Sequence, residues 1–196
     1  MEKQRLFFGI PLSENVRAEL ASEIHVLKAR PVPASLRLVW ASPENLHVTL
    51  KFLGGTDPGQ IAQILGQART ALKEFHPFEV SIEGLGGFPN LDSPQILWAG
   101  VNVASENIIR IAKSLDGALV PLGFRSENRP FHPHVTLARV KEGKGLRKIL
   151  EPIPNHDFGT CRVDQVILFE SHTPSHAPVK YEPLFRIQLS EPAHGP

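Results

Sequence analysis

Apolar and polar positions alternate in some stretches of the chain and recur at helical spacing in others, so the pattern predicts both strands and helices. Apolar residues at intervals of three and four predict amphipathic helices that begin near Ser13, Asp57 and Ser105. Asp57 and Ser105 can cap their helices, and a short helix is expected over residues 146–150. Alternating stretches predict strands over residues 5–10, 36–40, 46–53, 78–85, 95–103, 134–140, 162–169 and 184–189.

These elements repeat in order along the chain. Each half runs strand, helix, strand, helix, strand, and a glycine-rich break at residues 86–89 ends the strand that closes the first half. A repeat of this kind predicts a duplicated α+β fold with a cleft where the two halves face each other. We expect residues 1–196 to form a single domain of two pseudo-symmetric lobes.

Composition and charge narrow the class of protein. With 196 residues, of which 41% are apolar and 21% charged, the chain can bury a sizeable core, which excludes fibrous and low-complexity proteins. The formal net charge is only +1, so no overall field draws the chain to nucleic acid or anionic lipid. Any site for an anion must therefore be local.

A single cysteine and the short apolar runs indicate the compartment. Cys161 is the only cysteine, which excludes an internal disulfide and every multi-cysteine metal site. The apolar run over residues 6–10 is too short for a signal peptide, and no later run approaches the ~18 apolar residues of a membrane span. We therefore expect a cytoplasmic protein with no membrane partner.

The tetrapeptide His-Val-Thr-Leu occurs at residues 47–50 and again at residues 134–137, in corresponding strands of the two halves. Side chains alternate along a strand, so His47 and Thr49 share one face, and His134 and Thr136 share the matching face. A polar strand face that only meets solvent is the alternative interpretation of either motif alone, and the matched placement of two disfavours it. If a two-fold relates the halves, both imidazoles point into one cleft.

Two imidazoles and two hydroxyls in one cleft suit in-line displacement at a phosphodiester. One ring takes a proton from the attacking oxygen while the other gives a proton to the leaving oxygen. Imidazole titrates near pH ~6.5, so both protonation states are accessible near neutrality. Threonine hydroxyls can donate to the non-bridging oxygens of the phosphate. This scheme requires neither a metal nor a cofactor.

The His-Pro-His sequence at residues 132–134 raises the alternative of a metal pair. No third ligand follows at a recognisable spacing, so we expect no metal. The glycine-rich stretch at residues 84–87 is not followed by a predicted helix, and the chain contains no Walker A pattern. Neither observation favours a nucleotide cofactor, and we expect none.

Four sequence blocks, taken in order, resemble one known family. They read RLFFGI at residues 5–10, NLHVTLKFLG at 45–54, LWAGV at 97–101 and RPFHPHVTLAR at 129–139. These blocks look like the 2H phosphoesterase superfamily, and specifically its RNA 2′,3′-cyclic phosphodiesterase branch, also named 2′-5′ RNA ligases. The resemblance covers nearly the whole chain. It implies a two-lobed α+β fold with an antiparallel sheet, helices outside and the histidines in a central cleft.

The resemblance also implies a reaction and residue roles. The reaction is the opening of an RNA 2′,3′-cyclic phosphate to a 2′-phosphate end. By position in the family pattern, His47 is the proton donor to the departing 3′ oxygen and His134 is the proton acceptor from water. Thr49 and Thr136 hold the phosphate.

Two cations compete for the phosphate. Arg139, five residues after the second histidine, matches a phosphate-binding arginine of the family. Simple alternation puts Arg139 on the face opposite Thr136, so this role needs strand twist, a bulge or a long reach. Lys51 has the correct parity in the first strand and is the rival.

The substrate contacts and the main activity stay open at this level. Phe8, Trp98 and Phe131 are candidate stacking surfaces for bases, although each suits the core as well. We expect RNA ends with a 2′,3′-cyclic phosphate as the partner, and a monomer. Two alternatives are 2′-5′ joining of RNA ends as the main activity, because one site catalyses both directions, and a module that binds RNA ends without turnover.

Overall fold

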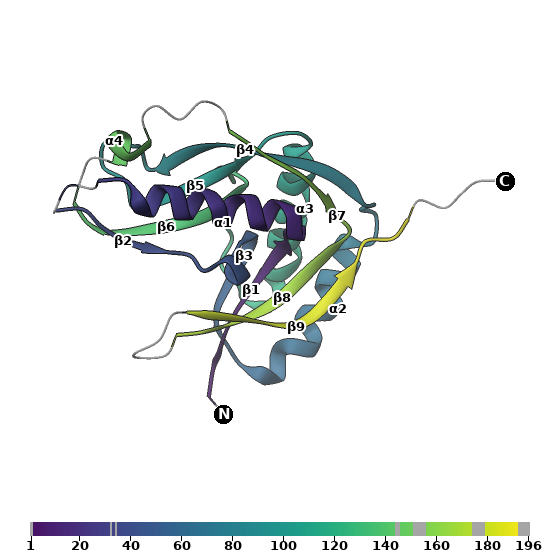
Figure 1. Cartoon of the computed structure of the whole chain (residues 1–196). Coiled ribbons are helices and arrows are strands. Elements are labelled where there is room, and N and C mark those ends of the chain that lie inside the picture. Colours follow the sequence, from purple (N-terminus) through teal and green to yellow (C-terminus); the bar gives the residue numbers. More distant parts are fainter. Residues whose placement is uncertain are drawn as a thin grey trace.

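One sheet runs through the part of the chain that the structure describes (Figure 1). The structure is a computed structural model, and it describes residues 2–31, 33, 35–143, 146–150, 156–173 and 179–191. Nine strands within these ranges belong to the sheet. They are β1 (Gln4–Pro11), β2 (Arg37–Trp40), β3 (His47–Thr56), β4 (Phe78–Phe88), β5 (Ile96–Val101), β6 (His134–Glu142), β7 (Asp157–Val163), β8 (Gln165–His172) and β9 (Lys180–Gln188).

The two strands that carry the repeated tetrapeptide are neighbours at the centre of this sheet. The order is β7-β4-β5-β6-β3-β1-β8-β9, with β2 also paired to β6, and every pairing is antiparallel. β3 and β6 meet where Val48 pairs with Val135. β1 flanks β3 and β5 flanks β6, so the order is close to symmetric about this central pair. The predicted α+β class with an antiparallel sheet is confirmed.

The two sides of the sheet do not coincide with the two halves of the chain. β4, which closes the first half, pairs with β5 of the second half. In the same way β8, from the second half, pairs with β1. Each side of the sheet therefore contains strands from both halves of the sequence. This exchange ties the two halves together through long-range hydrogen bonds.

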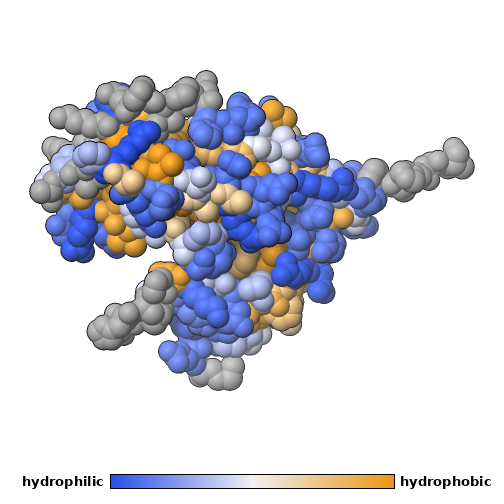
Figure 2. Space-filling model, in the orientation of Figure 1, coloured by the Kyte–Doolittle hydropathy of each residue, from blue (hydrophilic) through white to orange (hydrophobic). Residues whose placement is uncertain are grey.

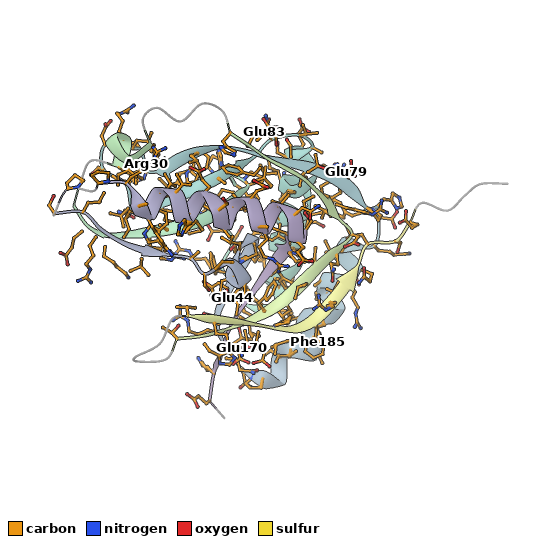
Figure 3. All side chains as sticks on the ribbon, viewed as in Figure 1. Arg30, Glu44, Glu79, Glu83, Glu170 and Phe185 are labelled. Atoms are coloured by element: carbon orange, nitrogen blue, oxygen red, sulfur yellow. The ribbon has the colours of Figure 1, made fainter. Side chains whose placement is uncertain are left out.

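The helices are α1 (Glu14–Ala29), α2 (Ile61–Leu72), α3 (Ser105–Leu119) and the short α4 (Leu146–Leu150), with 3₁₀ turns η1 (Pro43–Asn45), η2 (Pro58–Gln60) and η3 (Val120–Leu122). α1 packs against β7, α2 packs against α3, and α3 also contacts β3. Figure 3 shows Arg30 beside α4, where its guanidinium donates to the carbonyl of Ile149 at 2.6 Å. No helix among the described residues is long and apolar enough to cross a membrane.

Ser13 caps α1 as expected, whereas Asp57 caps the turn η2 and α2 follows at Ile61 without a side-chain cap of its own. The hydroxyl of Ser13 accepts from the backbone N–H of Val16, and the carboxylate of Asp57 accepts from that of Gly59 at 2.9 Å, at the start of η2. The prediction that Ser105 caps α3 is wrong. Ser105 is the first helical residue, and Ala104 precedes it with a positive φ of 54°.

Two predicted strand boundaries are also wrong, and both have a physical reason. The strand β4 continues through Gly86 instead of ending there. The indole of Trp98 fills the space where a Cβ at residue 86 would lie, so glycine is the residue that fits at this position of the strand. The predicted strand over residues 162–169 is two strands, divided at Asp164. β7 pairs with β4 and β8 with β1, at different places in the sheet, so the chain must turn between them.

The core lies between the sheet and the helices and includes the apolar faces of both central strands. Val48, Leu50, Val135 and Leu137 are all buried there. The prediction that these residues face the core, away from the histidines and threonines, is confirmed. The face of the molecule in Figure 2 is mostly hydrophilic, with apolar residues in separate areas.

Candidate active site

A β-bulge in each central strand determines which side chains reach the site. In β3, Thr49 pairs with Gly9 and Lys51 pairs with Phe8, so Leu50 is an extra residue between two consecutive partners. In β6, Leu137 is extra in the same way, between the partners of β5. An extra residue reverses the alternation of side chains that follow it. Each strand therefore keeps a polar face up to the bulge and changes parity after it.

The bulge in β6 resolves the parity problem of Arg139. After Leu137 the alternation reverses, so Arg139 returns to the face of His134 and Thr136, where it is exposed and lines the cleft. The matching residue of β3 is Phe52, whose side chain lines the same cleft and is 66% exposed. The two motifs therefore place an arginine on one wall and an aromatic ring on the other.

The two histidines line one cleft of about 940 Å³. Because Val48 pairs with Val135, His47 lies opposite Thr136, and Thr49 lies opposite His134. The histidines are thus diagonal neighbours on one face of the antiparallel pair. In a regular ladder such neighbours lie roughly 7–8 Å apart. A backbone separation of this size is compatible with one phosphate lying between the two side chains.

His47 is held in one tautomer by its own strand. Its Nδ1 donates to the carbonyl of Asn45 at 2.7 Å, which leaves Nε2 as an acceptor 2.9 Å from the hydroxyl of Thr49. Aromatic rings surround the imidazole, with Phe7 at 4.9 Å and Tyr181 edge-on at 5.1 Å between centroids. Burial among these rings lowers the pKa of His47 to about 4, opposed by the hydrogen bond to Asn45.

His134 has a similar but more open setting. Its Nδ1 donates to the carbonyl of His132 at 2.7 Å, so its Nε2 is also the free nitrogen. The ring of Phe88 meets it edge-on at 5.0 Å between centroids. Burial, and then the nearby charges of His132 and Arg139, lower the pKa of His134 below its usual value. The lowered pKa values favour the neutral form of both imidazoles in the free protein. In each ring Nδ1 is bonded to the backbone, so Nε2 is the nitrogen that can act on a substrate.

Asn45 was not singled out by the sequence, although it organises the wall beside His47. Its amide donates to the carbonyl of Val179 at 2.6 Å, and its side-chain oxygen accepts from the N–H of Tyr181 at 3.3 Å. Both Val179 and Tyr181 line the cleft. Its contacts are with residues more than 130 positions later, so no local pattern could have revealed this role.

Two residues proposed from the sequence as substrate contacts are buried. Phe8 is fully buried in the core, so its prediction as a stacking surface is wrong; its neighbour Phe7 contacts His47 instead. Lys51 borders the cleft, but the bulge at Leu50 turns its ammonium toward the buried face, which favours Arg139 as the phosphate cation. The side chain of Lys51 is 3% exposed, and its ammonium lies 2.5 Å from the carboxylate of Asp116.

Of the remaining aromatic candidates, one lines the cleft and the other packs behind its wall. Phe131 is half-buried and lines the cleft. Trp98 is also half-buried, but it packs behind the cleft wall, 5.0 Å from the ring of His132 and 5.1 Å from that of Phe88. Among the described residues, His132 and His134 are not part of any group of three or more side chains arranged to hold a metal ion.

The fold and the site together define a class of protein in which two His-x-Thr strands face one cleft across an approximate two-fold. A family model for the 2′-5′ RNA ligase superfamily matches residues 16–174. The chain belongs to this superfamily, and the resemblance to the 2H phosphoesterases is confirmed.

Three relatives place the chain more closely. An RNA 2′,3′-cyclic phosphodiesterase of Methanothermobacter thermautotrophicus is 35% identical over 180 residues, which cover 90% of this chain and 95% of that protein. A crystal structure from Thermus thermophilus superposes with a TM-score of 0.78 at 26% identity, covering 95% of this chain and 98% of that one. The LigT protein of E. coli in complex with 3′-AMP gives 0.76 at 26% identity, with 96% and 99% covered. These findings confirm the prediction that the chain is an enzyme, a hydrolase.

Proposed function

We propose that this enzyme opens RNA 2′,3′-cyclic phosphate ends to 2′-phosphate ends by acid and base catalysis from two histidines, without a metal. The observation that carries the proposal is the diagonal placement of His47 and His134 over one cleft, each with its Nδ1 bonded to a backbone carbonyl, so that Nε2 is the nitrogen left to act on a substrate. The names of its relatives support the choice of substrate. A monomer and a single domain over residues 1–196 belong to the same proposal.

In this mechanism the cyclic phosphate lies between the two rings. His134 takes a proton from the attacking water, while His47 gives a proton to the departing 3′ oxygen on the other side of the phosphorus. Thr49, Thr136 and Arg139 donate to the non-bridging oxygens, where charge increases in the transition state. Every hydrogen-bond donor that this step needs comes from the two motif strands.

The lowered pKa values fit unequal roles. A neutral His134 is ready to act as the base at pH 7. His47 must first gain a proton, and the negative charge of the bound phosphodiester favours its protonated form. The hydroxyl of Thr49, 2.9 Å from Nε2 in the free protein, can then turn from the ring to a phosphate oxygen. A ring with so low a pKa is a strong acid once it is protonated, which suits a donor to a poor leaving group.

The RNA chain next to the reacting phosphate has two aromatic surfaces in the cleft. Phe52 is widely exposed beside the His47 wall, and Phe131 lines the cleft near the His134 wall. Bases stack on such rings with little dependence on sequence. We assign base stacking to these two residues in place of Phe8.

The test is product analysis with a short RNA that ends in a 2′,3′-cyclic phosphate, incubated with the enzyme in excess chelator. The expected product carries only a 2′-phosphate, and a variant with both His47→Ala and His134→Ala yields none. A 3′-phosphate product, or activity that returns only with added metal, contradicts the proposal. Halves of a cleaved RNA in the same assay measure 2′-5′ joining, and joining faster than hydrolysis favours the ligase alternative. Binding without product favours the RNA-end binding module.

A further inference from the structure

A buried ion pair connects the first catalytic strand to the segment that precedes the second. Lys51 follows the bulge of β3, and its ammonium lies 2.5 Å from the carboxylate of Asp116 in α3 and 2.5 Å from the carbonyl oxygen of Arg125. The side chains are 3% and 16% exposed. Neither group takes part in the proposed proton transfers.

Asp116 holds the same segment through two more hydrogen bonds. Its carboxylate accepts from the hydroxyl of Ser126 at 2.6 Å and from the backbone N–H of Glu127 at 3.1 Å. Although burial opposes ionisation, the bonds from Lys51, Ser126 and Glu127 hold the pKa of Asp116 below its usual value, so its carboxylate is charged at pH 7. One carbonyl, one hydroxyl and one N–H of residues 125–127 are thus fixed by a single pair.

The segment held in this way forms part of the cleft wall. Residues 124–133 contain no helix or strand, so backbone ladders do not fix their path. Arg129 and Phe131, in the middle of this segment, both line the cleft. Their positions depend on how the segment is anchored at its two ends, and β6 provides the second anchor.

The internal repeat shows that the strand does not need a lysine at this position. Ala138 follows the bulge of β6 as Lys51 follows that of β3, and it is fully buried as a plain apolar residue. A bulged strand of this fold therefore accommodates an apolar side chain there. Since a buried ion pair is seldom more stable than an apolar pair of equal volume, stability alone does not explain Lys51.

We propose that Lys51 and Asp116 are positioning residues for RNA capture: they hold residues 125–127 so that Arg129 and Phe131 stand in the cleft, where they contact the RNA chain beyond the reacting phosphate. The inference rests on the proposed function for the identity of the ligand. It predicts that the pair affects binding of the RNA much more than the chemical step, because His47, His134 and both threonines are held by the strands themselves.

The experiment uses the double variant Lys51→Met with Asp116→Leu. An apolar pair of similar volume keeps the core filled and leaves no buried charge alone, whereas Lys51→Met by itself leaves Asp116 unpaired. The matched control is Arg162→Met with Glu191→Leu, which removes an exposed ion pair with a 2.6 Å contact at another place in the fold. Circular dichroism and thermal unfolding confirm that both variants are folded.

The readouts are kcat and KM on an RNA with a cyclic phosphate end, the Kd for an RNA with a 2′-phosphate end, and hydrogen exchange. In the double variant we expect KM and Kd to rise at least tenfold, while kcat stays within about threefold of the wild-type value. The backbone amides within residues 126–132 should exchange faster. The control variant should show none of these changes. Unchanged KM and Kd, or a loss confined to kcat, overturns the inference. The Kd and exchange arms need no turnover, so a wild-type protein that binds RNA without hydrolysis contradicts the proposed function alone.

Discussion

The pH dependence of turnover follows directly from the burial of the two imidazoles. With a pKa of about 4, His47 is protonated in roughly one free molecule in a thousand at pH 7. The pKa of His134 is also below 6.5. In the proposed mechanism the free enzyme must have His47 protonated and His134 neutral. Since kcat/KM reports the free enzyme and both pKa values are lowered, the optimum of kcat/KM lies below the usual imidazole pKa of ~6.5.

The enzyme–substrate complex behaves differently. A bound phosphodiester places one negative charge between the rings, which favours protonated imidazole and raises both pKa values. The optimum of kcat, which reports the complex, is therefore at a higher pH than that of kcat/KM. The size of this difference measures how strongly the phosphate charge is felt at the two rings, at about 1.36 kcal/mol per pKa unit.

The assay measures initial rates from about pH 4 to 8.5 for the wild type and for the variants His47→Ala and His134→Ala, with circular dichroism at each pH. Each variant should lose about 10²–10⁴-fold in kcat, as expected for removal of a general acid or base. His134→Ala should lose the acidic limb of the profile, where the base must be unprotonated, and His47→Ala the alkaline limb. An optimum of kcat/KM at or above pH 7, or both limbs retained in both variants, would refute this reasoning.

Three further predictions concern single side chains. Arg139→Met should lower kcat/KM about 10- to 100-fold, because a charge-assisted hydrogen bond to phosphate is lost, and Arg139→Lys should recover part of the loss in steady-state assays. Phe52→Ala should raise KM for RNA about 5- to 100-fold with kcat retained, whereas Phe52→Trp should keep the wild-type KM; equal loss in both variants contradicts stacking. The pKa of His47 is lower in the folded chain than in the unfolded chain. The unfolded state therefore binds more protons as pH falls from 6.5 to about 4, and the free energy of unfolding should drop by on the order of 3 kcal/mol over this range. Denaturant unfolding of His47→Gln should show a smaller drop over the same window, and an identical drop would contradict it.

The sequence correctly predicted that His47 and His134 lie in one cleft. The apolar faces of the two motif strands pack into the core, which leaves the histidines on the other face. The sequence could not show which face of the strand the residues after each motif occupy. The bulges at Leu50 and Leu137 follow from how β3 pairs with β1 and β6 with β5, and such register is a property of partner strands. Simple alternation therefore places Lys51 on the face of the histidines and Arg139 on the opposite face, and the bulges reverse both placements.

The wrong prediction for Phe8 also has its origin in strand pairing. In β1 the residues from Leu6 to Ile10 are all buried, because the strand has neighbours on both edges and is covered on both faces. A continuous apolar run does not show which ring meets the site, so Phe8 could not be separated from Phe7. The exposed ring of Phe52 is found by comparing the two motifs, since it stands where the second motif has Arg139.

The measurement that tests the central claim most directly uses a cyclic substrate in which sulfur replaces the bridging 3′ oxygen. A thiolate leaves without a proton, since thiols titrate near pH ~8.5, so the substrate needs a base but no acid. The account predicts that His47→Ala opens this substrate at nearly the wild-type rate, while His134→Ala remains slow. Rescue of His134→Ala instead, or of neither variant, contradicts the assignment of His47 as the proton donor and His134 as the proton acceptor.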